Sequence, residues 1–148
     1  MFGRIVVGTD GSETAGEAVR QATEIAKLSG ARLDVVSAFE PIPQQRIKAE
    51  AGSAPGDVQY EISPREDVNL VLDNAGAAAR KEGIEEVHTH SREGDPADAI
   101  LDVAEEINAD LIVVGNKGMT GAKRFLLGSV PNKVSHHAPC SVIIVRTS

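Results

Sequence analysis

Aromatic residues are nearly missing from this sequence. Its 148 residues include three phenylalanines, one tyrosine and no tryptophan. Single-stranded nucleic acid is usually held by stacking of its bases on aromatic side chains, so such a platform is not expected here. The core must be built from Val, Ile, Leu and Ala, which suits helices packed on a parallel sheet.

The sequence also lacks an excess of positive charge, a second cysteine and a long apolar run. Its 15 Lys and Arg residues face 22 Asp and Glu residues, a net charge of −7. Nucleic acids and membrane surfaces are polyanionic, so neither is expected as a partner. Cys140 alone cannot close an internal disulfide, which fits a reducing compartment. No run approaches the ~20 apolar residues of a transmembrane helix, and no signal peptide precedes the first strand, so we expect a cytoplasmic protein.

What the sequence does contain is an alternation of short β-branched runs with helical stretches. This alternation predicts one open α/β domain over residues 1–148, with a mainly parallel sheet. The run at 85–93 is the most polar of the expected strands, which places it near an edge. Strands are expected at 4–10, 32–39, 85–93, 110–115 and 141–146, and helices from Ser12 to Ser29, from about Pro64 to Gly83, from Asp95 onward and from Ser129 to His137.

Residues 40–62 differ in character from the rest of the chain. They contain three prolines together with glycines and polar residues. Such a composition predicts a long loop that is mobile in part. No internal repeat and no domain linker is evident.

Residues 115–130, GNKGMTGAKRFLLGSV, follow the fourth expected strand. In open α/β sheets, ligands bind beyond the carboxyl ends of the strands, where the strand order reverses. Gly115 and Gly118 would let backbone amides approach an anion without a Cβ in the way. Gly128 and Ser129 open the last helix, whose free N–H groups attract phosphate. The stretch therefore predicts a phosphate cradle, although a pair of tight turns would use the same glycines.

The spacing G-x-x-G-x(9)-G-S resembles the signature of the ATP-binding branch of the universal stress protein family. Gly115, Gly118, Gly128 and Ser129 match it position for position. The similarity continues through IVVGTDGSE, GDPADAI, ADLIVVGNKG, LLGSVPNKV and APCSVIIV. The resemblance implies a doubly wound, five-stranded parallel sheet in the order 3-2-1-4-5, with helices on both faces. It also implies a homodimer that forms through the last strand, 141–146.

The resemblance assigns roles at the site as well. Asp10 corresponds to an aspartate near the ribose or the bound metal, although it would alternatively only cap the first helix. The backbone of Ala38 corresponds to the contact with the adenine edge. Because Ser37 and Ala38 stand where the family often has His-Val, the shape of the base pocket is left open. The expected nucleotide-binding residues are Thr9, Asp10, Ala38, Gly115, Lys117, Gly118, Gly128, Ser129 and Val130.

The nucleotide implied by the resemblance is ATP, with Mg²⁺ or Mn²⁺ held through its phosphates, and cyclic AMP is the alternative. We expect a stress-response or signalling protein that acts by nucleotide-dependent conformation or choice of partner. A slow ATPase or phosphotransferase is the alternative class. Phosphoryl transfer needs a positioned nucleophile and groups that stabilise the developing charge. The segments VVGTDGS and VVGNKG, after the first and fourth expected strands, contribute one carboxylate, Asp10, and no clear base. His88 and His90 face one side of a strand, which fits a polar edge better than a metal site.

Overall fold

The computed structural model describes residues 2–39, 64–116 and 129–146. The loop expected at 40–62 lies outside these ranges. The described strands are β1 (Arg4–Gly8), β2 (Arg32–Phe39), β3 (Val87–Glu93), β4 (Leu111–Gly115) and β5 (Ser141–Val145). The described helices are α1 (Glu13–Ser29), α4 (Pro64–Lys81), α5 (Pro96–Glu106) and α6 (Ser129–His137).

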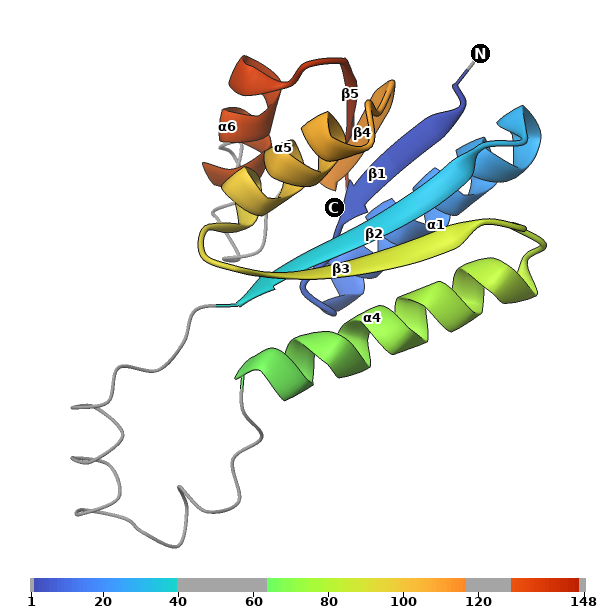
Figure 1. Cartoon of the computed structure of the whole chain (residues 1–148), viewed down its shortest axis with the longest axis horizontal. Coiled ribbons are helices and arrows are strands. Elements are labelled where there is room, and N and C mark those ends of the chain that lie inside the picture. The colour runs from blue at the N-terminus through green and yellow to red at the C-terminus, as the bar shows by residue number, and fades with distance from the viewer. Residues whose placement is uncertain (1, 40–63, 117–128, 147–148) are drawn as a thin grey trace, which may run out of the picture.

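The strands form one sheet in the order β3-β2-β1-β4-β5, and all neighbouring pairs are parallel. Helices α1 and α4 cover one face of this sheet, and α5 and α6 cover the other (Figure 1). The expected α/β fold, its strand order and its helices on both faces are therefore confirmed. The strand order reverses between β1 and β4, which makes that pair the switch point of the sheet.

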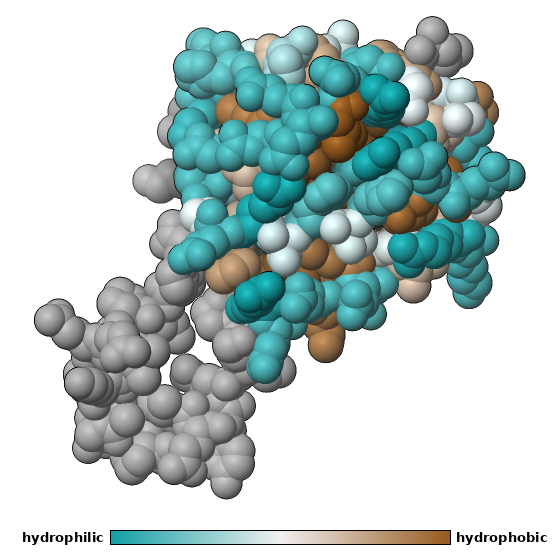
Figure 2. Space-filling view, in the orientation of Figure 1, coloured by the Kyte–Doolittle hydropathy of each residue, from teal (hydrophilic) through white to brown (hydrophobic). Residues whose placement is uncertain are grey.

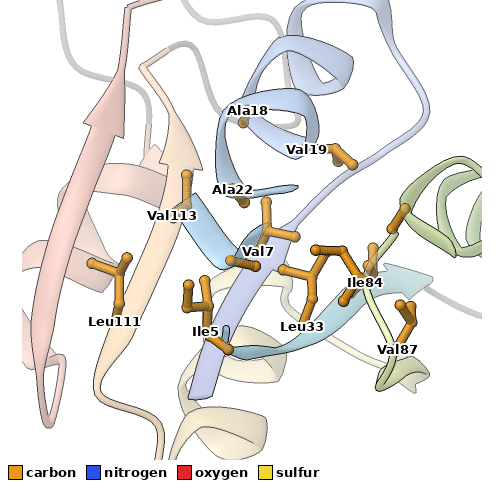
Figure 3. Packing of buried hydrophobic residues seen from close by; sticks show 14 of the residues in the cluster. Ile5, Val7, Ala18, Val19, Ala22, Leu33, Ile84, Val87, Leu111 and Val113 are labelled. Atoms are coloured by element: carbon orange, nitrogen blue, oxygen red, sulfur yellow. The ribbon is translucent and has the colours of Figure 1, made fainter. Parts of the chain in front are cut away.

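The core consists of two aliphatic layers separated by the sheet. Side chains alternate along a strand, so Ile5 and Val7 of β1 face α1 while Val6 faces α5. All three are 0% exposed. Figure 3 shows the first layer, where Ala18 and Ala22 of α1 lie over strand residues. The small alanines let the helix backbone approach the sheet closely, and the partly buried Phe2 and Phe39 pack against the same layer.

Two helix starts follow from capping residues that the sequence predicts. The Ser12 side chain accepts a hydrogen bond from the Ala15 amide at 3.2 Å and begins α1. The Asp95 side chain accepts one from the Asp98 amide at 3.0 Å and begins α5, with a proline in the first turn. Each cap satisfies an N–H group that has no partner within its helix. Both starts lie at the carboxyl edge of the sheet.

The first strand is shorter than the sequence pattern predicts. It ends at Gly8 rather than at residue 10, because Thr9 and Asp10 use their side chains to form a turn. The third strand starts at Val87 rather than at residue 85, and its expected place at an edge of the sheet is confirmed.

The surface is mainly hydrophilic on the face shown in Figure 2, with hydrophobic residues appearing between the helices. The polar character of β3 contributes to this, since His88, His90 and Arg92 are all only partly buried. None of the described helices is both long enough and apolar enough to cross a membrane.

Candidate functional site

The sheet divides at its carboxyl edge between β1 and β4. Pairing of β1 with β4 ends at Val7 and Val113, whereas β1 pairs with β2 as far as Gly8, and β4 pairs with β5 as far as Gly115. The backbones of Gly8 and Gly115 therefore lie at the point where the two central strands part. This is the crevice at which open α/β sheets bind ligands.

Ala38 presents an unpaired stretch of backbone to the same edge. In a parallel sheet, alternate residues of a strand direct their N–H and C=O groups to opposite neighbours. The Arg32 amide donates to Gly3 and the Thr9 amide donates to Val36, so even-numbered residues of β2 face β1. The ladder between β1 and β2 ends at the Thr9–Val36 hydrogen bond, and among the described residues nothing continues it to Ala38.

Thr9 and Asp10 explain why the ladder stops there. The next donor toward the Ala38 carbonyl would be the Gly11 amide, which instead donates to Thr9 Oγ1 at 3.1 Å. The Ser12 amide likewise donates to Asp10 Oδ1 at 2.9 Å. Thr9 is 2% exposed and Asp10 is half-buried. These two side chains turn the chain after β1 away from β2, and within the described ranges no backbone hydrogen bond takes up the side of Ala38 that faces β1.

The fourth component of the edge is the start of α6. Ser129 is the first residue of this helix and is exposed, whereas Val130 is 4% exposed and packs beneath it. The first N–H groups of a helix have no partners within it, and with the helix dipole they attract anions. Lys133, one turn on, lies 2.8 Å from Asp98 Oδ1 and 3.4 Å from Asp95 Oδ2, and so joins α6 to the start of α5.

The described part of the expected site is thus assembled from four segments. Thr9, Asp10, Ala38 and Gly115 come from the ends of β1, β2 and β4, and Ser129 and Val130 come from α6. Lys117, Gly118 and Gly128 lie outside the described residues. Within the described residues, no group of three or more His, Cys, Asp or Glu side chains is arranged to hold a metal ion.

A charged cluster on β2 and β3 is the main feature that the sequence pattern did not reveal. Asp34 is 0% exposed and lies between the buried apolar residues Leu33 and Val35 of β2. Arg32 donates to both of its carboxylate oxygens, at 2.7 and 3.0 Å. His90 Nε2 lies 2.7 Å from Asp34 Oδ2. Burial alone would raise the pKa of Asp34, but the hydrogen bonds from His90 and Arg32, together with their charges, lower it below its usual range.

The same cluster explains the two histidines of β3. His90 pairs with Asp34, and His88 Nε2 lies 3.0 Å from Glu86 Oε2. Each imidazole is thus paired with a carboxylate of its own. The interpretation of β3 as a polar edge strand therefore has a structural basis in these hydrogen bonds. The signal in the sequence was Arg32 and Asp34 two positions apart, which places both side chains on one face of a strand.

Two hollows on the surface lie away from the carboxyl edge. One, of about 370 Å³, lies at the amino ends of β2 and β3, among residues that include Lys27, Gly30, Gly83 and Glu86. The other, of about 300 Å³, lies between α1 and α4. Neither presents unpaired backbone groups at the switch point of the sheet. We therefore place the candidate site at the carboxyl edge, on topology and hydrogen bonding rather than on the size of a hollow.

Comparison with known proteins gives a single family. The family model described as "Universal stress protein family" matches residues 1–146. Universal stress protein Rv1636 of Mycobacterium tuberculosis is 38% identical over 144 residues, which cover 97% of this chain and 96% of that protein.

Solved structures give the same result. A crystal structure of a universal stress protein in complex with cAMP is similar with a TM-score of 0.74 and 34% identity, and the match covers 99% of both chains. A universal stress protein of Archaeoglobus fulgidus in complex with dAMP has a TM-score of 0.68 and 27% identity, with 96% of both chains covered. Sequence and structure agree over nearly the whole length, and this chain is a member of the universal stress protein family.

Proposed function

We propose that this protein binds an adenine nucleotide in the crevice between β1 and β4, and that the nucleotide is ATP. The observation that carries the proposal is the open backbone edge of Ala38. The adenine ring offers an N–H donor beside a ring-nitrogen acceptor, which complements a peptide C=O and N–H on one strand edge. Thr9 and Asp10 keep this edge free by turning the chain away from it.

In this proposal the phosphates lie at the start of α6. The amides of the first turn, at Ser129 and Val130, and the dipole of the helix attract them. Gly115, at the end of β4, allows close approach of the ribose and phosphates. Gly118 and Gly128 complete the signature, and Lys117 adds a positive charge in the same stretch. Asp10 binds the ribose, or Mg²⁺ or Mn²⁺ carried by the phosphates.

Cyclic AMP is the second candidate, and one observation favours it. A solved structure that is 34% identical over 99% of this chain contains cAMP. Cyclic AMP has one phosphate, needs no metal, and would use the same adenine contact at Ala38. The two nucleotides therefore differ in what they require at α6 and Asp10, and not in how their base is held.

The role that follows is binding and signalling in a stress response. The site offers amides and a helix terminus, which hold charge well, and the segments that end β1 and β4, VVGTDGS and VVGNKG, contribute one carboxylate, Asp10. Efficient phosphoryl transfer requires more groups around the phosphates than this. A nucleotide that orders the carboxyl edge would alter the surface presented to a partner. We propose a cytoplasmic location and no nucleic-acid partner for this role.

The homodimer is proposed to form through β5. This strand forms one edge of the sheet, and its residues Val142 and Ile143 are only partly buried while Ile144 is 37% exposed. An apolar edge strand of this kind exposes a row of backbone groups and aliphatic side chains that a second copy would cover.

Isothermal titration calorimetry of the nucleotide-free protein tests the proposed ligand. ATP is expected to bind in the presence of Mg²⁺, and cAMP is expected to bind more weakly. Tight binding of cAMP without any response to ATP would replace the first candidate by the second. Absence of binding for both, together with AMP and ADP, would contradict the proposed function.

The same titration on variants tests the position of the site. Gly128→Ala is expected to weaken binding by roughly tenfold or more, because a Cβ would intrude where amides must approach the phosphates. Gly121→Ala is the matched control, since Gly121 lies in the same glycine-rich stretch but outside the signature. Equal affinities for the two variants would show that the signature glycines do not form the cradle.

A further inference from the structure

The turn after β1 is in direct contact with α4. Gly11 has a positive φ of 83°, and a methyl group added there would lie 2.6 Å from Cγ2 of Val71 and 3.4 Å from its Cγ1. Val71 is half-buried on α4, between Val68 and Leu72, which are buried against the sheet. The backbone of the turn therefore lies against a side chain of α4, a helix whose neighbouring residues Val68 and Leu72 belong to the core.

Gly11 lies between the two hydrogen bonds that shape the turn. Its own amide donates to Thr9 Oγ1, and the following amide, of Ser12, donates to Asp10 Oδ1. A shift of Gly11 would lengthen both bonds together. It would also move the Gly11 amide, whose alternative acceptor is the carbonyl of Ala38 in a continued ladder. The contact with Val71 thus lies where a small displacement affects Thr9, Asp10 and Ala38 at once.

We propose that Val71 is a positioning residue for the nucleotide site, and that its contact with Gly11 holds the β1–α1 turn in the form that binds the base and ribose. This proposal rests on the proposed function, because it concerns the same site. Val71 touches the turn and not the nucleotide, so it acts through Gly11. Helix α4 is thereby connected to a site whose other described residues come from β1, β2, β4 and α6.

The geometry accounts for a glycine at position 11. The positive φ disfavours any side chain, and the distance to Val71 leaves no room for one. Gly30 shares the positive φ of Gly11 but not its lack of space for a side chain. It has a φ of 67°, but a methyl group added there would meet nothing within 4 Å, and it lies at the opposite edge of the sheet.

Nucleotide affinity and amide hydrogen exchange of the full chain test the proposal together. Val71→Ala removes the support and is expected to weaken binding roughly threefold to tenfold, as expected if about a tenth to a third of molecules retain the competent turn. The Gly11 and Ser12 amides are expected to exchange faster in this variant. Leu70→Ala, at the neighbouring exposed position of α4, is expected to change neither property.

A double variant separates packing from backbone strain. Gly11→Ala is expected to weaken binding about tenfold, since it combines a strained φ with a clash. Adding Val71→Ala removes the clash, so the double variant should bind nucleotide at least as tightly as Gly11→Ala alone. Independent effects would instead multiply the two losses of affinity. Gly30→Ala carries a similar strain and is expected to lower the melting temperature without changing affinity.

Outcomes that overturn this proposal differ from those that overturn the proposed function. If the parent protein binds nucleotide, and Val71→Ala leaves both the affinity and the exchange of the Gly11 and Ser12 amides unchanged, Val71 is not a positioning residue. If the parent binds no adenine nucleotide, the proposed function fails. In that case the exchange of the Gly11 and Ser12 amides still tests whether Val71 supports the turn. Unchanged exchange in Val71→Ala would show that it does not. Faster exchange would show that Val71 supports the turn but has no role in nucleotide binding.

Discussion

Asp34 shows how a single buried charge is accommodated in an aliphatic sheet. Its carboxylate is 0% exposed and receives hydrogen bonds from Arg32 and His90. A buried carboxylate without such partners would be protonated or strongly destabilising. The three side chains extend from β2 and β3 on the face that α5 covers, away from the candidate site at the carboxyl edge.

Asp34→Asn is expected to lower the free energy of unfolding at pH 7 by about 2–3 kcal/mol. The substitution removes the buried negative charge to which Arg32 and His90 are hydrogen-bonded, and Arg32 keeps its 3.4 Å contact with the exposed Glu86. Urea denaturation followed by circular dichroism measures this loss. Asp73→Asn, which changes an exposed carboxylate of α4, is the control and should alter stability by less than about 0.5 kcal/mol.

The loss is also expected to depend on pH. The pKa of Asp34 is lower in the folded protein than in the unfolded chain. The contribution of Asp34 to the free energy of unfolding is therefore fully present above its pKa in the unfolded chain, about 3.9. It is lost as the pH falls through the lower pKa of the folded protein. The stability difference between the parent and Asp34→Asn should shrink in urea titrations below about pH 4. A difference that stays constant down to pH 2.5 would contradict the role assigned to this carboxylate.

Three helices begin at the carboxyl edge of the sheet. The caps of α1 and α5 and the first residue of α6 all lie at the edge where the strands end. Lys133 connects two of these helices through its ion pairs with Asp95 and Asp98. The side chains of this link are exposed, so its contribution to stability is small.

Asp95→Ala is expected to lower the free energy of unfolding by about 1 kcal/mol. The substitution leaves the Asp98 amide without its acceptor at the start of α5. Thermal unfolding measures the loss. Glu105→Ala, an exposed position in the last turn of the same helix, is expected to have little effect. Equal melting temperatures for Asp95→Ala and the parent would show that the cap does not contribute.

The sequence predicts most of the elements because periodicity and capping are local signals. Ser12, Gly30 and Asp95 mark helix ends through interactions with residues a few positions away. The contact between Gly11 and Val71 could not be predicted in this way. It joins two residues that are far apart in sequence, and it depends on how α4 packs beside the turn.

The same limit applies to Asp34 and to the open edge of Ala38. The pairing of Asp34 with His90 requires the register of β2 with β3, which no local pattern specifies. The resemblance to the family predicted a backbone role for Ala38. The feature on which we base the proposed role is visible only in the ladder, where the Gly11 amide donates to Thr9 Oγ1 instead of continuing toward Ala38.

At the scale of the whole molecule, the two edges of the sheet differ in chemistry. The β3 edge has polar side chains, among them His88 and His90 with carboxylate partners outside the strand, whereas β5 is largely aliphatic. Charged residues on an edge strand discourage pairing with another chain, and an apolar edge favours it. This asymmetry supports association through β5 alone among the described edges.

Ile144→Lys is expected to convert the proposed dimer into a monomer. A lysine in the middle of β5 would place a charge in the contact between the two copies. Size-exclusion chromatography with light scattering, at several concentrations, measures the mass. Leu70→Lys replaces an apolar residue of α4 that is 57% exposed, and it should leave the mass unchanged. A monomeric parent protein would contradict the proposed interface.

The proposed site itself is tested most directly by mapping backbone amide shifts while nucleotide is added to the ¹⁵N-labelled protein. We expect ATP to shift the amides of Asp10, Ala38, Gly115 and Val130, at the carboxyl edge. The amides of Gly30 and Gly83, beside the hollow of about 370 Å³ at the opposite edge, should not move. Shifts confined to Gly30, Gly83 and their neighbours would contradict the account, because the nucleotide would then bind at the amino ends of the strands.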